Sequence, residues 1–186
     1  MSDQMLLTQF IVTFFLMGLY WALTDTRGIV NRYTSFFKAS GFGMNVYAVL
    51  TILIYIHTSL IFKFPRSGFD AYFIPVGLLL FYSGACFSLW AKITMKNYWG
   101  PPAQHDSIKQ TKLITSGPFE ISRNPIYLGL LLMIVGIGIA MKSYSVLLCI
   151  VIYYGIHKVI LKEESLLTKQ FGEEYKKYLK TVRRLI

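Results

Sequence analysis

The sequence predicts an all-α membrane protein of about five transmembrane helices, with a long cytoplasmic loop before helix four and a C-terminal amphipathic helix. Hydrophobic residues make up 54% of the 186 residues and charged residues 15%, which is more apolar surface than a soluble domain of this size can bury. The apolar residues gather in runs that can cross a hydrocarbon core about 30 Å thick. The net charge of +10 comes from basic residues beside these runs, which favours membrane lipid headgroups over nucleic acid as partners.

The expected helices follow the apolar runs in order. They cover residues 5–24, 44–62, 71–91, 126–141 and 144–161. The last two almost adjoin, which predicts a tight antiparallel hairpin. The fourth contains Gly129, Gly136 and Gly138, and small residues let membrane helices approach closely. The two cysteines, Cys86 and Cys149, lie inside runs without any metal-ligand spacing, so we interpret them as small core residues.

The distribution of basic residues predicts the orientation of the chain. Three Lys or Arg residues lie between the first two runs, five lie in and beside the segment between the third and fourth, and eight lie from the end of the fifth onwards. Sixteen of the 19 therefore fall on one side, and only Lys63, Arg66 and Lys142 fall on the other. Since cytoplasmic loops carry the excess of Lys and Arg, we expect the N-terminus outside and the C-terminus in the cytoplasm.

The segment after the fifth run has the pattern of an amphipathic helix. Leu167, Phe171, Tyr175 and Tyr178 recur at spacings of four, four and three, although Gly172 interrupts the pattern. Such a helix either lies on the membrane surface with its lysines in water or forms a lid over a site. The pattern leaves both interpretations open.

Polar residues mark the cytoplasmic ends of the last two runs. Arg123 and Asn124 precede Pro125 at the start of the fourth run, and Glu163 and Glu164 follow the fifth. Asn is a good N-cap and Pro suits the first helical turn, so Asn124 is expected to cap the fourth helix. Acidic residues at a helix C-terminus oppose the helix dipole, so the two glutamates have no simple structural explanation.

The hairpin should bring these polar residues together. Arg123 lies 19 residues before Lys142 and Glu163 lies 20 residues after Ser143, so the two ends return to a similar depth. We expect Arg123 to meet one of the two glutamates, because adjacent helical residues point about 100° apart. The contact is either a structural ion pair or part of a polar site at the membrane interface, where the helix N-terminus favours an anionic group.

Four segments, taken in order, form a longer pattern. They are residues 117–119 (Gly-Pro-Phe), 123–129 (Arg-Asn-Pro-Ile-Tyr-Leu-Gly), 163–164 (Glu-Glu) and 171–178 (Phe-Gly-Glu-Glu-Tyr-Lys-Lys-Tyr). This order and spacing resembles the isoprenylcysteine carboxyl methyltransferase and phospholipid methyltransferase superfamily, over about residues 95–184. The resemblance implies an integral membrane methyltransferase that transfers a methyl group from S-adenosylmethionine to a lipid or other lipophilic, membrane-embedded acceptor.

The resemblance also implies roles by position. Residues 92–186, with the hairpin at 126–161, would be the cofactor-binding and catalytic region, and residues 1–91 would supply helices one to three. Arg123 and Glu164 would be catalytic. The implied cofactor-binding residues are Leu113, Ile114 and Thr115 on the adenosine side through their backbone, Gly117, Pro118 and Phe119 at the turn, and Asn124, Tyr127 and Glu163 around the methionine moiety.

Two positions depart from the family's pattern. Asn124 stands where the family usually has His, and Thr111 stands where it often has His. Asn still forms hydrogen bonds but cannot carry a proton near neutral pH, which affects the identity of the acceptor more than the fold. Two alternatives stay open, namely an NADPH-dependent membrane reductase of the sterol-reductase type and a non-enzymatic transporter component. No inverted repeat supports a transporter.

Overall fold

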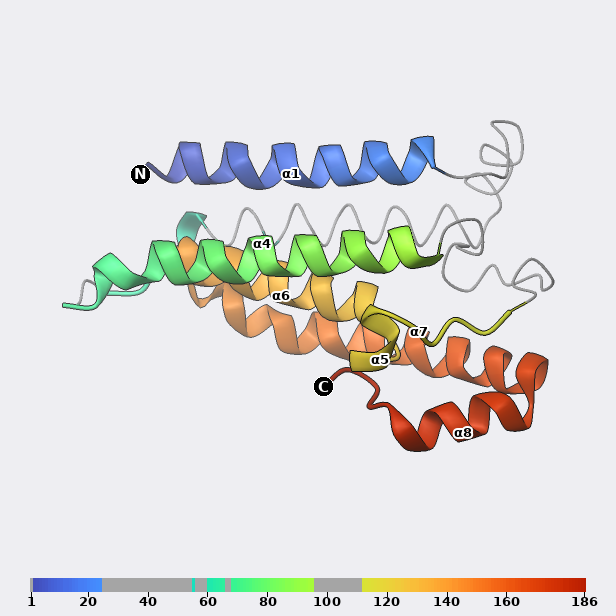
Figure 1. Ribbon diagram of the computed structural model, residues 1–186. Coiled ribbons are helices and arrows are strands. Elements are labelled where there is room, and N and C mark those ends of the chain that lie inside the picture. The colour runs from blue at the N-terminus through green and yellow to red at the C-terminus, as the bar shows by residue number, and fades with distance from the viewer. Residues whose placement is uncertain (1, 25–54, 56–59, 66–67, 96–111) are drawn as a thin grey trace, which may run out of the picture.

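The computed structural model describes residues 2–24, 55, 60–65, 68–95 and 112–186 (Figure 1). Within these ranges the regular structure is helical, apart from one isolated antiparallel bridge between Lys63 and Ser143. The elements are α1 (Asp3–Leu23), α4 (Asp70–Met95), α5 (Pro118–Ile121), α6 (Pro125–Ala140), the 3-10 helix η2 (Tyr144–Leu147), α7 (Leu148–Phe171) and α8 (Glu173–Thr181).

Three helical segments are long and apolar enough to span a membrane, namely Asp3–Trp21, Asp70–Met95 and Tyr144–Phe171. They confirm the first, third and fifth expected helices. The fourth is present as α6, whose 16 residues fall short of the roughly 20 that a span usually needs. Most of the second expected helix, residues 44–62, lies outside the described ranges, so a count of five is not confirmed.

α4 and α6 form the closest helix pair, and glycine makes their approach possible. A Cβ on Gly136 would lie 2.6 Å from both the carbonyl oxygen of Gly77 and the backbone nitrogen of Phe81. α6 packs far more extensively on α4 than on α7. The expected antiparallel hairpin of α6 and α7 is present but is not tightly packed, because Gly129 and Gly136 of α6 face α4, while Gly138 faces Tyr55 and Val146.

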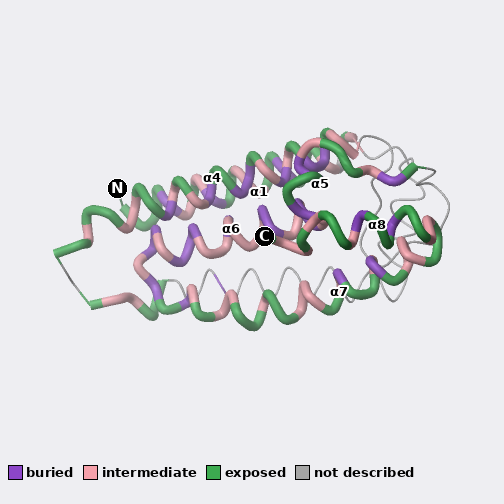
Figure 2. Tube along the Cα trace, turned by 60° about the horizontal axis from the view of Figure 1, so that its bottom comes forward, coloured by how far each residue is buried: buried purple, intermediate pink, exposed green. Residues whose placement is uncertain are grey.

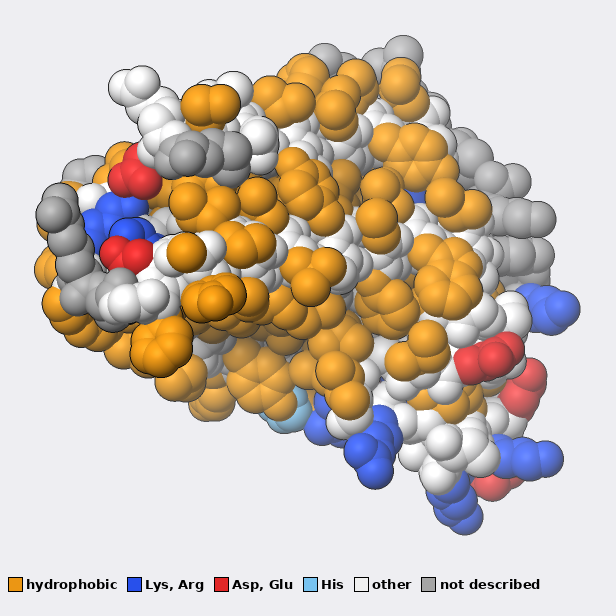
Figure 3. Space-filling model, turned by 60° about the vertical axis from the view of Figure 1, so that its left-hand side comes forward, with side chains coloured by type: hydrophobic (Ala, Val, Ile, Leu, Met, Phe, Trp, Pro, Cys, Tyr) orange, Lys and Arg blue, Asp and Glu red, His pale blue; other side chains and the backbone are white. Residues whose placement is uncertain are grey.

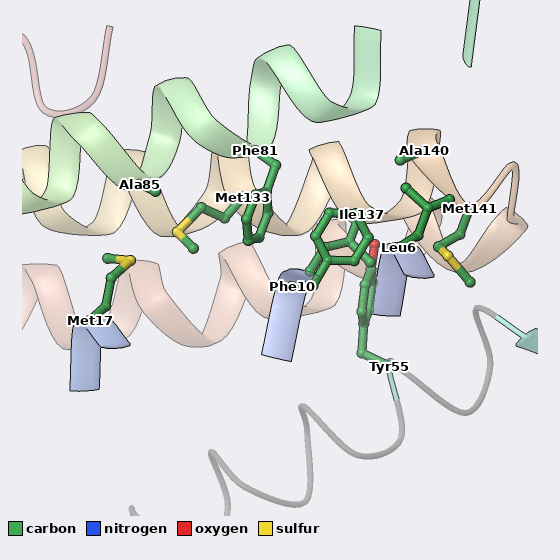
Figure 4. Packing of buried hydrophobic residues seen from close by; sticks show 10 residues of the cluster. All are labelled: Leu6, Phe10, Met17, Tyr55, Phe81, Ala85, Met133, Ile137, Ala140 and Met141. Carbon is green, nitrogen blue, oxygen red and sulfur yellow. The ribbon is translucent and has the colours of Figure 1, made fainter. Parts of the chain in front are cut away.

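Apolar side chains from α1, α4 and α6 build the core between these helices (Figure 4). The Phe10 and Phe81 rings lie 4.6 Å apart, and Met133 and Ile137 of α6 are buried beside them. Such close packing holds α6 in a fixed position along α4, and α6 in turn carries the polar residues at its N-terminal end.

The outer surface of the helices is apolar between two charged ends. Figure 3 shows hydrophobic side chains covering one face, with charged side chains gathered at its margins. α7 is exposed along most of its length (Figure 2), and its Ile150 and Val151 are 70% and 62% exposed. An apolar surface of this extent needs lipid around it. The protein is therefore an integral membrane protein.

The C-terminal region differs from the single amphipathic helix predicted after residue 161. α7 continues without a break to Phe171, because no helix-breaking residue occurs before Gly172. Gly172 has φ of +53°, a left-handed conformation that glycine adopts readily, and α8 folds back from there (Figure 1). Tyr175 and Tyr178 of α8 are buried against Leu113 and Phe171. The expected amphipathic pattern is thus divided between two helices.

Candidate active site

An ion pair lies where α6 begins and α7 approaches its end. Arg123 Nη2 lies 3.0 Å from Glu164 Oε1, and these two side chains are only 9% and 10% exposed. Arg123 Nη1 also donates to the Leu179 carbonyl oxygen at 2.8 Å. The expected meeting of Arg123 with one of the two glutamates is confirmed, and Glu164 is the partner.

Glu163 also reaches α6, one helical turn further along. The Tyr127 hydroxyl donates to Glu163 Oε1 at 2.9 Å. The two glutamates thus have different partners, Tyr127 for Glu163 and Arg123 for Glu164. Arg123, just before the N-cap of α6, and Tyr127, in its first turn, therefore contact neighbouring positions of α7.

Arg184 is a third charged member of this site, and the sequence pattern did not identify it. Its Nη2 donates to Glu164 Oε2 at 2.8 Å, and its Nε lies 3.1 and 3.2 Å from the two oxygens of Glu164. Glu164 is thus shared by two guanidinium groups. No spacing rule could have found Arg184, because its position depends on the reversal at Gly172.

The backbone of the C-terminal segment attaches to the start of α6. Arg123 N donates to the Arg183 carbonyl oxygen at 3.0 Å. Ser122 Oγ and Asn124 Nδ2 donate to the Arg184 carbonyl oxygen at 3.2 and 3.0 Å. Asn124 occupies the N-cap position, but its side chain accepts no cap hydrogen bond. The expected capping role of this side chain is therefore wrong, and Asn124 instead anchors the C-terminal segment.

The Gly-Pro-Phe motif forms a tight turn beside this cluster. Gly117 has φ of +63°, which explains glycine at this position, and Pro118 starts the short helix α5. Pro118 and Phe119 are buried. The Tyr178 hydroxyl donates to the Phe119 carbonyl oxygen, and burial raises the pKa of Tyr178, so the hydroxyl keeps its proton at physiological pH. This bond fastens α8 onto the turn.

Leu113, Ile114 and Thr115 lead into the turn in an extended stretch. The Leu113 side chain is buried under α8, Ile114 is half-buried and Thr115 is exposed. Their backbone N–H and C=O groups form no hydrogen bond with any other described residue. Thr111, the second departure from the family's pattern, lies outside the described ranges.

The arrangement offers charges of both signs together with unsatisfied donors. Arg123 Nε is buried and has no hydrogen-bond partner among the described residues. A buried donor without a partner is costly, so it marks a position that a ligand's acceptor group would satisfy. The Glu164 carboxylate beside it would suit a cationic group of the same ligand.

One of the comparisons with known proteins gives a match. A family model described as phospholipid methyltransferase matches residues 72–174, which is more than half of the chain and includes nearly all of α4 and the whole of α5, α6 and α7. No curated protein and no solved structure matches the chain.

Proposed function

Because the chain belongs to the phospholipid methyltransferase family, and is thus an S-adenosylmethionine-dependent enzyme that methylates a lipid acceptor, we propose that the transfer takes place at the Arg123–Glu164 end of α6 and α7. The observation that carries the proposal is the buried Arg123–Glu164 pair with its unpartnered Nε. Family membership favours this activity over the reductase and transporter alternatives.

The residues of the site fit the cofactor's methionine moiety, which has one carboxylate and one ammonium group. Arg123 would bind the carboxylate through its unpartnered Nε, and Glu164 would bind the ammonium. Tyr127 and Glu163 would line the same end of α6 and α7. The backbone groups of residues 113–115 would hold the adenosine side. In these assignments each charged group of the cofactor meets a protein group of opposite charge, and the polar groups of the adenosine meet backbone donors and acceptors.

The bound cofactor supplies an electrophilic methyl group on a sulfonium sulfur. The acceptor's lone pair forms the new bond to carbon, and the sulfur keeps the electrons of the broken bond. Such a displacement is accelerated mainly by alignment and by exclusion of water. Here α8 provides the cover, since buried Tyr175 and Tyr178 fasten it over the turn at Gly117. The lid interpretation of the C-terminal region therefore suits this function better than a helix lying freely on the membrane.

Purified protein in lipid nanodiscs provides the test. It is incubated with radiolabelled S-adenosylmethionine and a membrane lipid extract, and labelled lipids are identified by mass spectrometry. We expect label in a lipid, together with calorimetric binding of S-adenosylhomocysteine. Binding of NADPH without binding of S-adenosylhomocysteine would overturn the proposal.

The orientation of this site follows from the charges. We propose that the Arg123–Glu164 end faces the cytoplasm, because sixteen of the 19 basic residues belong to that side. Reporter fusions after Ile186 and at Lys142 should report opposite sides of the membrane, with Ile186 in the cytoplasm. Equal locations for both fusions would reject this topology.

A further inference from the structure

Arg184 differs from Arg123 in its access to the surroundings. Its side chain is 35% exposed, whereas that of Arg123 is 9% exposed. Both guanidinium groups contact the same Glu164 carboxylate, so one negative charge is shared by two positive ones. The cluster of these three side chains carries an excess positive charge, and Arg184 presents that excess toward the outside.

The hydrogen bonds of Arg184 leave one edge of its guanidinium open. Of its five N–H groups, the one on Nε and one on Nη2 point to Glu164. The remaining three, two on Nη1 and one on Nη2, have no partner in the part of the chain that the structure describes. The Nη1–Nη2 edge is therefore oriented by Glu164 and free to bind a second anion with two parallel hydrogen bonds.

Exposed apolar residues occur in the two segments that meet at Arg184. Ile121, which precedes Ser122, and Ile186, at the C-terminus, are 55% and 76% exposed. Ser122 Oγ bonds to the Arg184 carbonyl oxygen, so the end of α5 lies beside the C-terminal segment. A guanidinium held by Glu164, in segments that also expose isoleucines, suits an anionic headgroup whose acyl chains continue along apolar protein surface.

We propose that Arg184 is a specificity-determining residue that binds the headgroup phosphate of a phospholipid acceptor through its Nη1–Nη2 edge. The proposal rests on the proposed function, because it places the acceptor next to the Arg123–Glu164 pair. It divides the cluster into two parts. Buried Arg123 binds the carboxylate of the cofactor, and half-exposed Arg184 binds the phosphate of the acceptor.

The experiment compares two amine acceptors that differ in their phosphate. Phosphatidylethanolamine and the phosphate-free long-chain amine oleylamine are each presented in neutral nanodiscs to the wild-type protein and to the variants. Arg184→Gln should raise KM for phosphatidylethanolamine about tenfold, the effect of losing one good charge-assisted contact. KM for oleylamine and the affinity for S-adenosylhomocysteine should change by less than about twofold, which is within 0.5 kcal/mol.

Two further variants serve as controls. Arg183→Gln removes the neighbouring charge, which is exposed and has no side-chain partner among the described residues, and it should change neither KM. Arg184→Lys keeps the charge but loses the fork, so it should give a KM for phosphatidylethanolamine between wild type and Arg184→Gln. If Arg184→Gln does not fold, the KM values of Arg184→Lys for the two acceptors test the proposal instead.

Three results would overturn the proposal. Equal increases in KM for both acceptors would assign Arg184 a structural role through Glu164. Loss of S-adenosylhomocysteine binding in Arg184→Gln would place Arg184 on the cofactor side. If Arg183→Gln raised KM for phosphatidylethanolamine as much as Arg184→Gln does, Arg184 would contribute only general positive surface charge. Wild-type protein that methylates neither lipid and binds no S-adenosylhomocysteine would instead reject the proposed function, and this inference with it.

Discussion

The two ends of the helical bundle both carry ion pairs, yet they differ in burial and connectivity. At the end where α1 and α4 begin, Lys63 pairs with Asp3 at 2.9 Å and Lys142 with Asp70 at 3.0 Å. These side chains are 30–53% exposed, and each lysine pairs with one carboxylate among the described residues. At the opposite end, Glu164 is 10% exposed and is shared by Arg123 and Arg184.

The difference separates a structural clamp from a site. Partly exposed ion pairs contribute about 0–1 kcal/mol each, and the pairs at the first end also coincide with backbone bonds that join residues 62–64 to residues 142–144. At the opposite end, a buried carboxylate is shared by two guanidinium groups, and Arg123 Nε beside it has no partner among the described residues. Because burying charged and unpaired polar groups costs desolvation energy, this arrangement contributes little net stability to the bundle. The proposed binding of S-adenosylmethionine would account for this arrangement.

The largest expected effect is at Glu164. Glu164→Gln should lower the rate of methyl transfer by about 100-fold or more, as when one preorganised polar group is removed from an active site. It also leaves Arg123 buried without a counter-charge, at a stability cost of about 3 kcal/mol. Glu120→Gln, at an exposed glutamate of α5, is the matched control and should retain wild-type turnover. Near-normal turnover in folded Glu164→Gln would show that the Glu164 end, like the other end, has only a structural role.

A smaller effect is expected at Tyr127. Tyr127→Phe removes the hydroxyl that donates to Glu163 and leaves the ring in place, so it should lower kcat/KM by about tenfold, the effect of one hydrogen bond to a charged group. Tyr72→Phe, at an exposed tyrosine near the start of α4, should have no effect. Kinetics of both variants under identical lipid conditions test this prediction, and equal kcat/KM values for the two would contradict it.

The smallest effect is expected at the clamp end. Asp70→Asn breaks the half-exposed pair with Lys142 and should lower the unfolding free energy by no more than about 1 kcal/mol. Turnover should be unchanged. A large loss of turnover at wild-type stability would show that the clamp end also acts in catalysis. Denaturant unfolding and a methyl-transfer assay on the same preparation make both measurements.

Local patterns predicted much of this architecture. Apolar runs predicted α1, α4 and α7, and the short glycine-containing run predicted α6, because each pattern directly reflects lipid contact or close packing. The depth argument predicted that Arg123 meets one of the glutamates. Gly117, which the family resemblance placed at a turn, has a positive φ there.

The remaining features depend on the path of the chain in three dimensions. Arg184 joins Glu164 only because Gly172 reverses the chain and α8 returns along α7, and a single glycine does not specify the direction of such a reversal. Asn124 reads as a helix cap, but the returning C-terminal backbone offers its amide a carbonyl acceptor instead. The sequence did not show that α6 packs on α4 more than on α7. That packing depends on how the glycines of α4 and α6 align along the two helices, which no local pattern specifies.

The most direct test of the central claim is a double-mutant cycle of Arg123→Ala and Glu164→Ala, measured as S-adenosylhomocysteine affinity by calorimetry. If the two residues bind one cofactor as a unit, each single variant should lose nearly as much affinity as the double variant, which gives a coupling of at least about 1 kcal/mol. Thermal stability of the same four proteins provides the comparison. Coupling that is present in stability and absent from affinity would contradict the account, because Arg123 and Glu164 would then form only a structural pair.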